Sequence, residues 1–172
     1  MNEIKNLIRN IPDFPSPGIL FRDITTLLKD PKGLNMAVDA IADCLKGIDF
    51  DLVLGPESRG FIFGVPLAYK MNKGFVPARK EGKLPAETAG KSYALEYGQA
   101  TIELHKDAIF PGSRIVIVDD LLATGGTAKA VADLAEELGA KVVAMTFLIE
   151  LTDLKGRLVL EGYDNIKSIL VY

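Results

Sequence analysis

The chain has 172 residues, of which 48% are apolar and 25% charged, and its formal net charge is −3. This composition is typical of a globular chain long enough for one domain with a sizeable core, so no disulfide or metal staple is needed. Its acidic balance argues against a general nucleic-acid binder but does not exclude a small anionic ligand, and its single cysteine is compatible with a reducing compartment.

The first residues predict a short helix and then an irregular loop. Residues 2–10 mix charged with isolated apolar side chains, which is typical of a short amphipathic helix and not of a secretory signal. Residues 12–18, PDFPSPG, contain three prolines that forbid a regular helix or a central strand. No stretch of the chain reaches the length of a membrane span. We therefore expect a cytoplasmic protein without a membrane partner.

Helix-like and strand-like segments then alternate along the chain. In GLNMAVDAIADCLK, residues 33–46, the apolar spacing predicts a core-facing helix with Cys44 as a buried structural thiol. Apolar runs predict strands, and amphipathic segments between them predict helices. The expected strands are 51–55, 74–78, 114–118, 141–149 and 167–171, and the expected helices between them are 58–71 and 126–138. This alternation predicts an α/β fold with a mainly parallel central sheet flanked by helices.

Residues 80–106 interrupt the alternation. Two strand-like runs, 91–97 and 100–105, flank Gly98 and Gln99, which predicts a hairpin that projects from the sheet. Long excursions of this kind in compact domains are typical of lids over active sites. We therefore predict a single domain over 1–172 with a flexible lid at 80–106.

The stretch IVIVDDLLATGGT, residues 115–127, carries the strongest indication of a binding site. Its apolar start predicts a strand buried on both faces, and ligands bind at the carboxyl ends of such strands. Asp119 and Asp120 follow there, and carboxylates accept hydrogen bonds from vicinal hydroxyls. The ATGGT loop then opens a helix, where backbone amides and threonine hydroxyls suit a phosphate. The loop has neither a Walker A ending nor spaced dinucleotide-binding glycines, so the pattern indicates a polyol phosphate.

Basic side chains follow two other predicted strands, at the edge of the sheet where the aspartates are expected. An arginine at a helix start can present its planar guanidinium to a pyrophosphate, or it can be an ordinary surface residue. A basic cluster around a glycine is more commonly a solvated charge run than a set of phosphate contacts. Their position at strand ends favours phosphate contact. The residues concerned are Ser58, Arg59, Arg79, Lys80 and Lys83.

The run VIVDDLLATGGT resembles the phosphoribosyl-diphosphate (PRPP) signature of the type I phosphoribosyltransferases. The resemblance implies the fold of that family. It also implies that Asp119 and Asp120 bind the ribose 2′- and 3′-hydroxyls. The loop that would cradle the 5′-phosphate consists of Ala123, Thr124, Gly125, Gly126 and Thr127.

Further segments resemble the adenine branch of that family over nearly the whole chain. FPSPGILFRDIT at 14–25 is similar to its base-binding region and GPESRGFIFG at 55–64 to its pyrophosphate-side turn and helix. ARKEGKLP at 78–85 is similar to its basic loop and SYALEYG at 92–98 to its catalytic lid. The implied reaction transfers ribose 5-phosphate from PRPP to N9 of adenine, giving AMP and pyrophosphate in purine salvage.

The same resemblance implies roles for individual side chains. Glu96 would manage the proton of a purine nitrogen, and Tyr97 would help seal the site against water. The pyrophosphate would be bound by the basic residues named above, with Ser58. Adenine would contact the N-terminal segment 1–30 and a residue after a later strand. An aromatic beside a loop more often packs inward, however, and a leucine at a strand end is a core residue by default. These residues are Leu20, Phe21, Arg22 and Leu151.

The sequence also allows expectations about the cofactor, the oligomeric state and alternative functions. The resemblance implies Mg²⁺ carried mainly by oxygens of PRPP and pyrophosphate, with no dedicated metal site on the chain, and a homodimer. A different purine base, hypoxanthine, guanine or xanthine, would change only the loop at 19–23. A non-enzymatic PRPP-sensing regulator would require a nucleic-acid module. A plain Rossmann-type nucleotide-binding module is disfavoured because its glycine fingerprint is absent.

Overall fold

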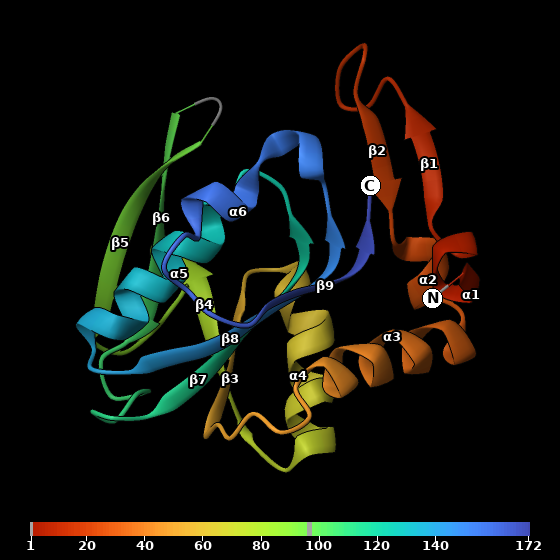
Figure 1. Ribbon diagram of the computed structural model, residues 1–172. Helices are drawn as coiled ribbons and strands as arrows, with labels where there is room; N and C mark the ends of the chain where they lie inside the picture. Colours follow the sequence, from red (N-terminus) through yellow and green to blue (C-terminus); the bar gives the residue numbers. More distant parts are fainter. Residues whose placement is uncertain (1, 96–97) are drawn as a thin grey trace. The chain divides into compact units, whose positions relative to one another are not determined.

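The structure, a computed structural model, describes residues 2–95 and 98–172 (Figure 1). The chain divides into two compact units, Met1–Ala40 and Ile41–Tyr172. The single domain expected over 1–172 therefore stays a prediction. Within the described residues, no helix is long and apolar enough to cross a membrane.

The first unit is built around a two-stranded antiparallel sheet. The predicted helix over 2–10 is wrong in its second half, because residues 9–12 form a strand that pairs with residues 20–23. The proline-rich loop connects these two strands, as its composition predicts. The helix predicted over 33–46 is confirmed, but Cys44 in its last turn is half-buried and not buried. The elements of this part of the chain are α1 (Asn2–Asn6), β1 (Arg9–Pro12), β2 (Leu20–Asp23), α2 (Thr25–Leu28) and α3 (Pro31–Cys44).

Asp23 joins the two strands to the helix that follows them. Its Oδ1 accepts the backbone N–H of Thr25 at 2.9 Å, and its Oδ2 accepts the Thr25 hydroxyl at 2.8 Å and Nε of Arg9 at 2.9 Å. The Thr25 backbone N–H and then the Arg9 guanidinium lower the pKa of Asp23 from 3.8 to about 2. The ionised carboxylate therefore stabilises the turn at which β2 ends and α2 begins.

The second unit contains a seven-stranded sheet with the order β5-β6-β4-β3-β7-β8-β9. Five neighbouring strands, β4 to β9 in this order, run parallel, and the β5–β6 hairpin joins them antiparallel to β4. The predicted α/β fold with a mainly parallel sheet is confirmed. The strands are β3 (Leu52–Pro56), β4 (Gly74–Lys80), β5 (Thr88–Leu95), β6 (Gly98–His105), β7 (Arg114–Leu122), β8 (Lys141–Glu150) and β9 (Ile166–Val171).

Two crossover helices fix where this sheet can bind a ligand. The crossovers β3-α4-β4 and β7-α5-β8 run in opposite directions along the sheet. Because such crossovers are right-handed, α4 and α5 cover opposite faces, and the strand order reverses between β3 and β7 (Figure 1). Binding crevices of open α/β sheets lie at the carboxyl ends of the strands at this switch point. The remaining helices are α4 (Arg59–Met71), α5 (Gly126–Glu137), the 3₁₀ helix η1 (Thr152–Leu154) and α6 (Gly156–Val159).

β7 lies at the centre of the core. All four residues of Ile115–Val118 have a relative exposure of 0%, since β3 and β8 flank the strand and α4 and α5 cover its faces. The apolar run in the sequence thus reports burial on both faces of a parallel strand. Beyond Val118 the strand reaches the edge of the sheet, and its next residues are the two aspartates.

The hairpin expected at 91–105 is present and longer than predicted. β5 begins at Thr88 and β6 ends at His105, and Arg79 and Lys80 of β4 pair with Glu103 and Ile102 of β6. The base of the hairpin therefore extends the sheet, and β5 packs on α5. Glu96 and Tyr97, the predicted lid residues, lie outside the described part of the chain.

We predict that Asp23→Asn lowers the free energy of unfolding at pH 7 by on the order of 1–2 kcal/mol. The folded-state pKa of Asp23 is lowered to about 2, so its contribution is complete above pH 3.8 and is lost as the pH falls through about 2. Urea denaturation at pH 7 and pH 2.5 measures the difference, which should shrink at the lower pH. Asp43→Asn is the matched control, because the Asp43 carboxylate and its partner Lys46 are both well exposed. An equal loss in both variants would contradict the assignment.

Candidate active site

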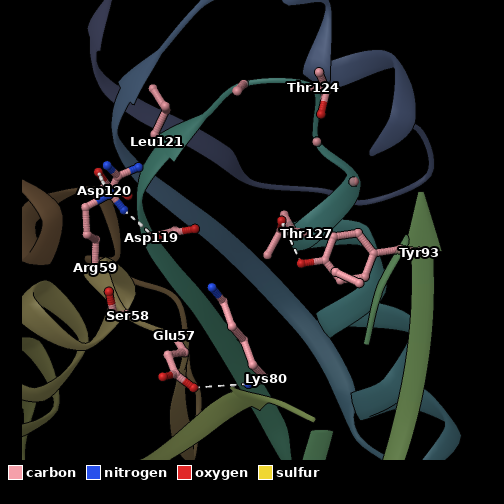
Figure 2. Close-up of a pocket in the computed structure, with 15 residues that line it drawn as sticks. Glu57, Ser58, Arg59, Lys80, Tyr93, Asp119, Asp120, Leu121, Thr124 and Thr127 are labelled. Atoms are coloured by element: carbon pink, nitrogen blue, oxygen red, sulfur yellow. Dashed lines mark hydrogen bonds and ion pairs between the residues drawn. The ribbon is translucent and has the colours of Figure 1, made fainter. Parts of the chain in front are cut away.

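An open cavity of about 540 Å³ lies at the carboxyl ends of β3 and β7, at the switch point of the sheet (Figure 2). Residues from the β3–α4 turn, β4, the hairpin and the β7–α5 loop surround it. It is lined by Glu57, Ser58, Arg59, Lys80, Tyr93, Ala100, Asp119, Asp120, Leu121, Ala123, Thr124, Gly125, Gly126, Thr127 and Ala128.

Asp119 and Asp120 stand at opposite sides of the end of β7. Asp119 points into the cavity, and its Oδ1 accepts the backbone N–H of Asp120 at 2.8 Å (Figure 2). The side chain of Asp120 is 6% exposed, and its Oδ2 lies 2.7 Å from Nε of Arg59 in the first turn of α4. Asp120 thus forms an ion pair with Arg59, whereas the carboxylate of Asp119 faces the cavity.

Burial of these carboxylates changes their acidity. Burial raises the pKa of Asp119 well above 3.8, and the neighbouring charge of Asp120 raises it further. Burial also raises the pKa of Asp120, against the opposing effect of Arg59. A carboxylate in such a place destabilises the empty protein, which is typical of groups placed to bind a ligand.

The loop after β7 turns its backbone around the cavity. Gly125 has a φ of +84°, a backbone conformation that residues with a side chain rarely adopt, and α5 begins directly after it. The N-terminus of α5 therefore faces the cavity with free amides and the positive end of the helix dipole. Figure 2 shows Thr124 and Thr127 on this loop, beside the cavity. Amides, hydroxyls and dipole together form a site that suits a phosphate.

Gly156 at the start of α6 supports this loop from behind. A Cβ atom at Gly156 would overlap the carbonyl oxygen of Ala123, and one at Gly125 would lie 2.5 Å from the Gly156 carbonyl oxygen. The adjacent Arg157 holds α6 in place, since its Nε and Nη2 donate to Glu150 at 2.7 and 2.8 Å. Two glycines are therefore required where the two backbones meet.

Cationic side chains lie on the side of the cavity opposite the loop. Lys80 points into the cavity between Glu57 and Tyr93 (Figure 2). Arg79 instead pairs with Glu57 through Nε at 3.2 Å and donates to the backbone carbonyl of Lys83 at 3.0 Å. Among the described residues, no group of three or more His, Cys, Asp or Glu side chains is placed to hold a metal ion.

The comparisons with known proteins agree with this geometry. Residues 23–168 match the family model of the phosphoribosyl transferase domain. An adenine phosphoribosyltransferase of Lachnoclostridium phytofermentans is 56% identical over 172 residues, which cover 100% of this chain and 98% of that protein. The chain belongs to the adenine phosphoribosyltransferase family. The resemblance seen in the sequence is thereby confirmed, and with it the expectation of a transferase enzyme.

Two solved structures extend this likeness to the fold. The adenine phosphoribosyltransferase of Thermoanaerobacter pseudethanolicus has a TM-score of 0.96 at 56% identity, with 99% of each chain covered. The enzyme of Saccharomyces cerevisiae, solved with adenine and an imino-altritol bisphosphate, has a TM-score of 0.89 at 39% identity, covering 99% of this chain and 96% of that one. These two relatives therefore share the fold of this chain over nearly its whole length.

The cavity brings together most of the residues predicted for PRPP. Arg79 and Lys83 do not line it, and neither does Leu151, whose backbone N–H donates to the carbonyl of Leu122 at 3.0 Å after the end of β8. The predicted residues that line it are Ser58, Arg59, Lys80, Asp119, Asp120, Ala123, Thr124, Gly125, Gly126 and Thr127.

The predicted adenine residues of β2 belong to the first unit. Leu20 is 45% exposed, and Phe21 packs edge-on against Phe14 with ring centroids 5.2 Å apart. Arg22 is half-buried, and its Nη1 donates to Oδ1 of Asn10. Their role toward a base stays a prediction.

Several residues around the cavity were not proposed from the sequence, among them Glu57, Tyr93 and Gly156. Glu57 follows β3 and holds both Arg79 and the backbone N–H of Lys80, at 3.1 Å. Tyr93 and Gly156 reach the β7–α5 loop from other parts of the chain. The sequence contains no local signal for Gly156, but Glu57 lies beside the Ser58–Arg59 pair at a strand end and could have been included.

We predict that Asp119→Asn stabilises the empty protein at pH 7.5, by on the order of 1 kcal/mol, while it weakens activity. The folded-state pKa of Asp119 lies above the ordinary value of 3.8, so its ionised form costs stability as the pH rises above 3.8. The gain should disappear near pH 4, where the wild-type carboxyl is protonated. Thermal unfolding at both pH values measures it, with Asp107→Asn in an exposed turn as the control. A gain that is equal at both pH values would contradict the burial argument.

We predict that Gly156→Ala lowers the free energy of unfolding by about 1–3 kcal/mol, because the added methyl group displaces the Ala123 carbonyl. Leu158→Ala in the same short helix is the control, since Leu158 is 67% exposed and its truncation should change stability by less than about 0.5 kcal/mol. Urea midpoints compare the two variants. Equal midpoints would show that α6 does not support the loop.

Proposed function

We propose that this chain transfers ribose 5-phosphate from PRPP to N9 of adenine and releases pyrophosphate. The observation that carries the proposal is the cavity at the switch point, where a carboxylate pair, a phosphate-type loop and cationic side chains face one another. The identity of the base that accepts the ribose 5-phosphate is inferred from the family relatives, including the yeast enzyme, whose structure contains adenine. The products are then AMP and pyrophosphate.

The ribose 5-phosphate part of PRPP fits the β7 side of the cavity. Asp119 faces the cavity with a carboxylate oxygen that can accept a hydrogen bond from a ribose hydroxyl, and Asp120 lies next to it. The loop 123–127 would hold the 5′-phosphate with its amides and hydroxyls. The separation of hydroxyl-binding and phosphate-binding groups along one strand and its loop matches the two ends of a ribose 5-phosphate.

The pyrophosphate part fits the opposite side. Ser58, Arg59 and Lys80 line the cavity there. Arg79 and Lys83, which do not line it, would add further positive charge. Pyrophosphate is bound best by such fixed cations. The oxygen-rich donor set fits Mg²⁺ that is carried mainly by substrate oxygens, and bound Mg²⁺ would neutralise charge on the leaving pyrophosphate.

The reaction breaks the bond between the anomeric carbon and pyrophosphate while N9 attacks. Positive charge then develops on the ribose, and negative charge grows on the leaving group. The carboxylates at the end of β7 stabilise the first charge, and Arg59 and Lys80 stabilise the second. The cavity is thus complementary to both charges of the transition state, which is the requirement for catalysis.

The base side of the proposal uses two other segments. Leu20, Phe21 and Arg22, with Leu151, would contact adenine through apolar surfaces and backbone groups. On the hairpin, Glu96 would handle the proton of the purine and Tyr97 would exclude water. We further propose a cytoplasmic homodimer that works as one domain per chain without nucleic-acid or membrane partners.

The test is pyrophosphate release from PRPP and Mg²⁺ with adenine, hypoxanthine, guanine, xanthine or no base. We expect release with adenine alone, because the family relatives act on that base. Asp119→Asn should reduce the release, and Asp107→Asn should not. Release with a different base would show that the base assignment, which depends on residues 19–23, is wrong. Absence of release in a protein that binds PRPP would favour a non-enzymatic PRPP-sensing regulator.

A further inference from the structure

We propose that Tyr93 is a positioning residue for the 5′-phosphate loop, an inference that rests on the proposed function. Tyr93 lies in β5, far from the loop in the sequence, and its Oη lies 3.3 Å from Oγ1 of Thr127 (Figure 2). Thr127 belongs to the first turn of α5, where a phosphate would bind. The contact links the hairpin directly to the loop.

The Tyr93 hydroxyl is held in place by the rest of its strand. The ring is half-buried and packs against the hydrophobic core of the sheet. Two residues earlier, on the same face of β5, Lys91 forms an ion pair with Glu137 in the last turn of α5. β5 is therefore attached near both ends of α5, so the hydroxyl has a fixed position relative to Thr127.

Because both groups are hydroxyls, the direction of this hydrogen bond can reverse when a ligand binds. A threonine hydroxyl has one proton to donate and two lone pairs, and a phosphate oxygen only accepts. In the empty protein the Thr127 hydroxyl donates to Oη of Tyr93. When a phosphate oxygen accepts the Thr127 proton instead, the two hydroxyls exchange roles, and Tyr93 donates its phenolic proton to Oγ1 of Thr127. The distance of 3.3 Å is longer than the usual value of about 2.7–2.8 Å, and such bonds tighten when a ligand binds. Tyr93 thus orients the Thr127 hydroxyl toward its ligand.

The ring of Tyr93 packs between two cavities, independently of its hydroxyl group, and this determines which variant tests the contact. Tyr93 lines the active-site cavity and also a second cavity of about 380 Å³, between β5 and α5, whose lining includes Lys129 and Val159. Removal of the ring would alter both cavities and the packing of the hairpin. Tyr93→Phe keeps the ring and removes only the hydroxyl, so it isolates the proposed contact.

The test compares Tyr93→Phe with Tyr163→Phe. The Tyr163 hydroxyl also bonds to α5, at 3.3 Å to Asp133 and 3.0 Å to Glu136, but it does not reach the loop. We expect Tyr93→Phe to raise the Kd for AMP and the KM for PRPP by about threefold to tenfold, with kcat and the KM for adenine changed by less than about twofold. Tyr163→Phe should leave all four values unchanged.

A double-mutant cycle with Thr127→Val completes the experiment. In the Thr127→Val background, Tyr93→Phe should change the AMP affinity no further, because the hydroxyl acts through Thr127. An unchanged AMP affinity in Tyr93→Phe, or an equal loss in the Thr127→Val background, would overturn the inference. A uniform loss of kcat and of affinity for every ligand would also overturn it. A wild-type protein that fails to bind AMP would instead overturn the proposed function.

Discussion

The candidate active site depends on the complete burial of one strand. Ile115–Val118 of β7 are shielded by two parallel neighbours and two helices, so the strand has no freedom to slide or turn. A shift by one residue would exchange the faces of every side chain on the strand. The same register that buries the apolar run also places Asp119 and Asp120 at its carboxyl end, beside the turn that follows β3. The packing of the core therefore sets the geometry of the charged groups.

Signals that are local in the sequence predicted the fold and the centre of the site. An apolar run followed by Asp119, Asp120 and a glycine-rich helix start is enough to predict a buried strand that ends at a binding site. Polar residues also follow β3, at Glu57–Arg59, and basic residues end β4, at Arg79 and Lys80. The strand at 9–12 was missed because its pairing with 20–23 crosses a proline-rich loop. Arg79 illustrates another limit: its charge is visible in the sequence, but its engagement with Glu57 depends on the meeting of two strands.

Some of the charged side chains around the cavity form ion pairs with one another, and others face the open space. Arg59 pairs with Asp120, and Arg79 pairs with Glu57, while Asp119 and Lys80 face the open space. The positive charge of Arg59 also acts on Asp119, and Glu57 accepts the backbone N–H of Lys80. A ligand with hydroxyls at one end and anionic oxygens at the other can therefore bind without a large rearrangement of the protein charges, which is the condition for electrostatic preorganisation.

The contact between Gly125 and Gly156 has a consequence for the order in which the site is assembled. The ribosome synthesises the whole β7–α5 stretch before α6, so the loop emerges without the backbone that supports it from behind. β8 must also have joined the sheet, because Arg157 is anchored on Glu150 at the end of that strand. The supported shape of the loop therefore requires a segment that the ribosome adds only after the loop itself.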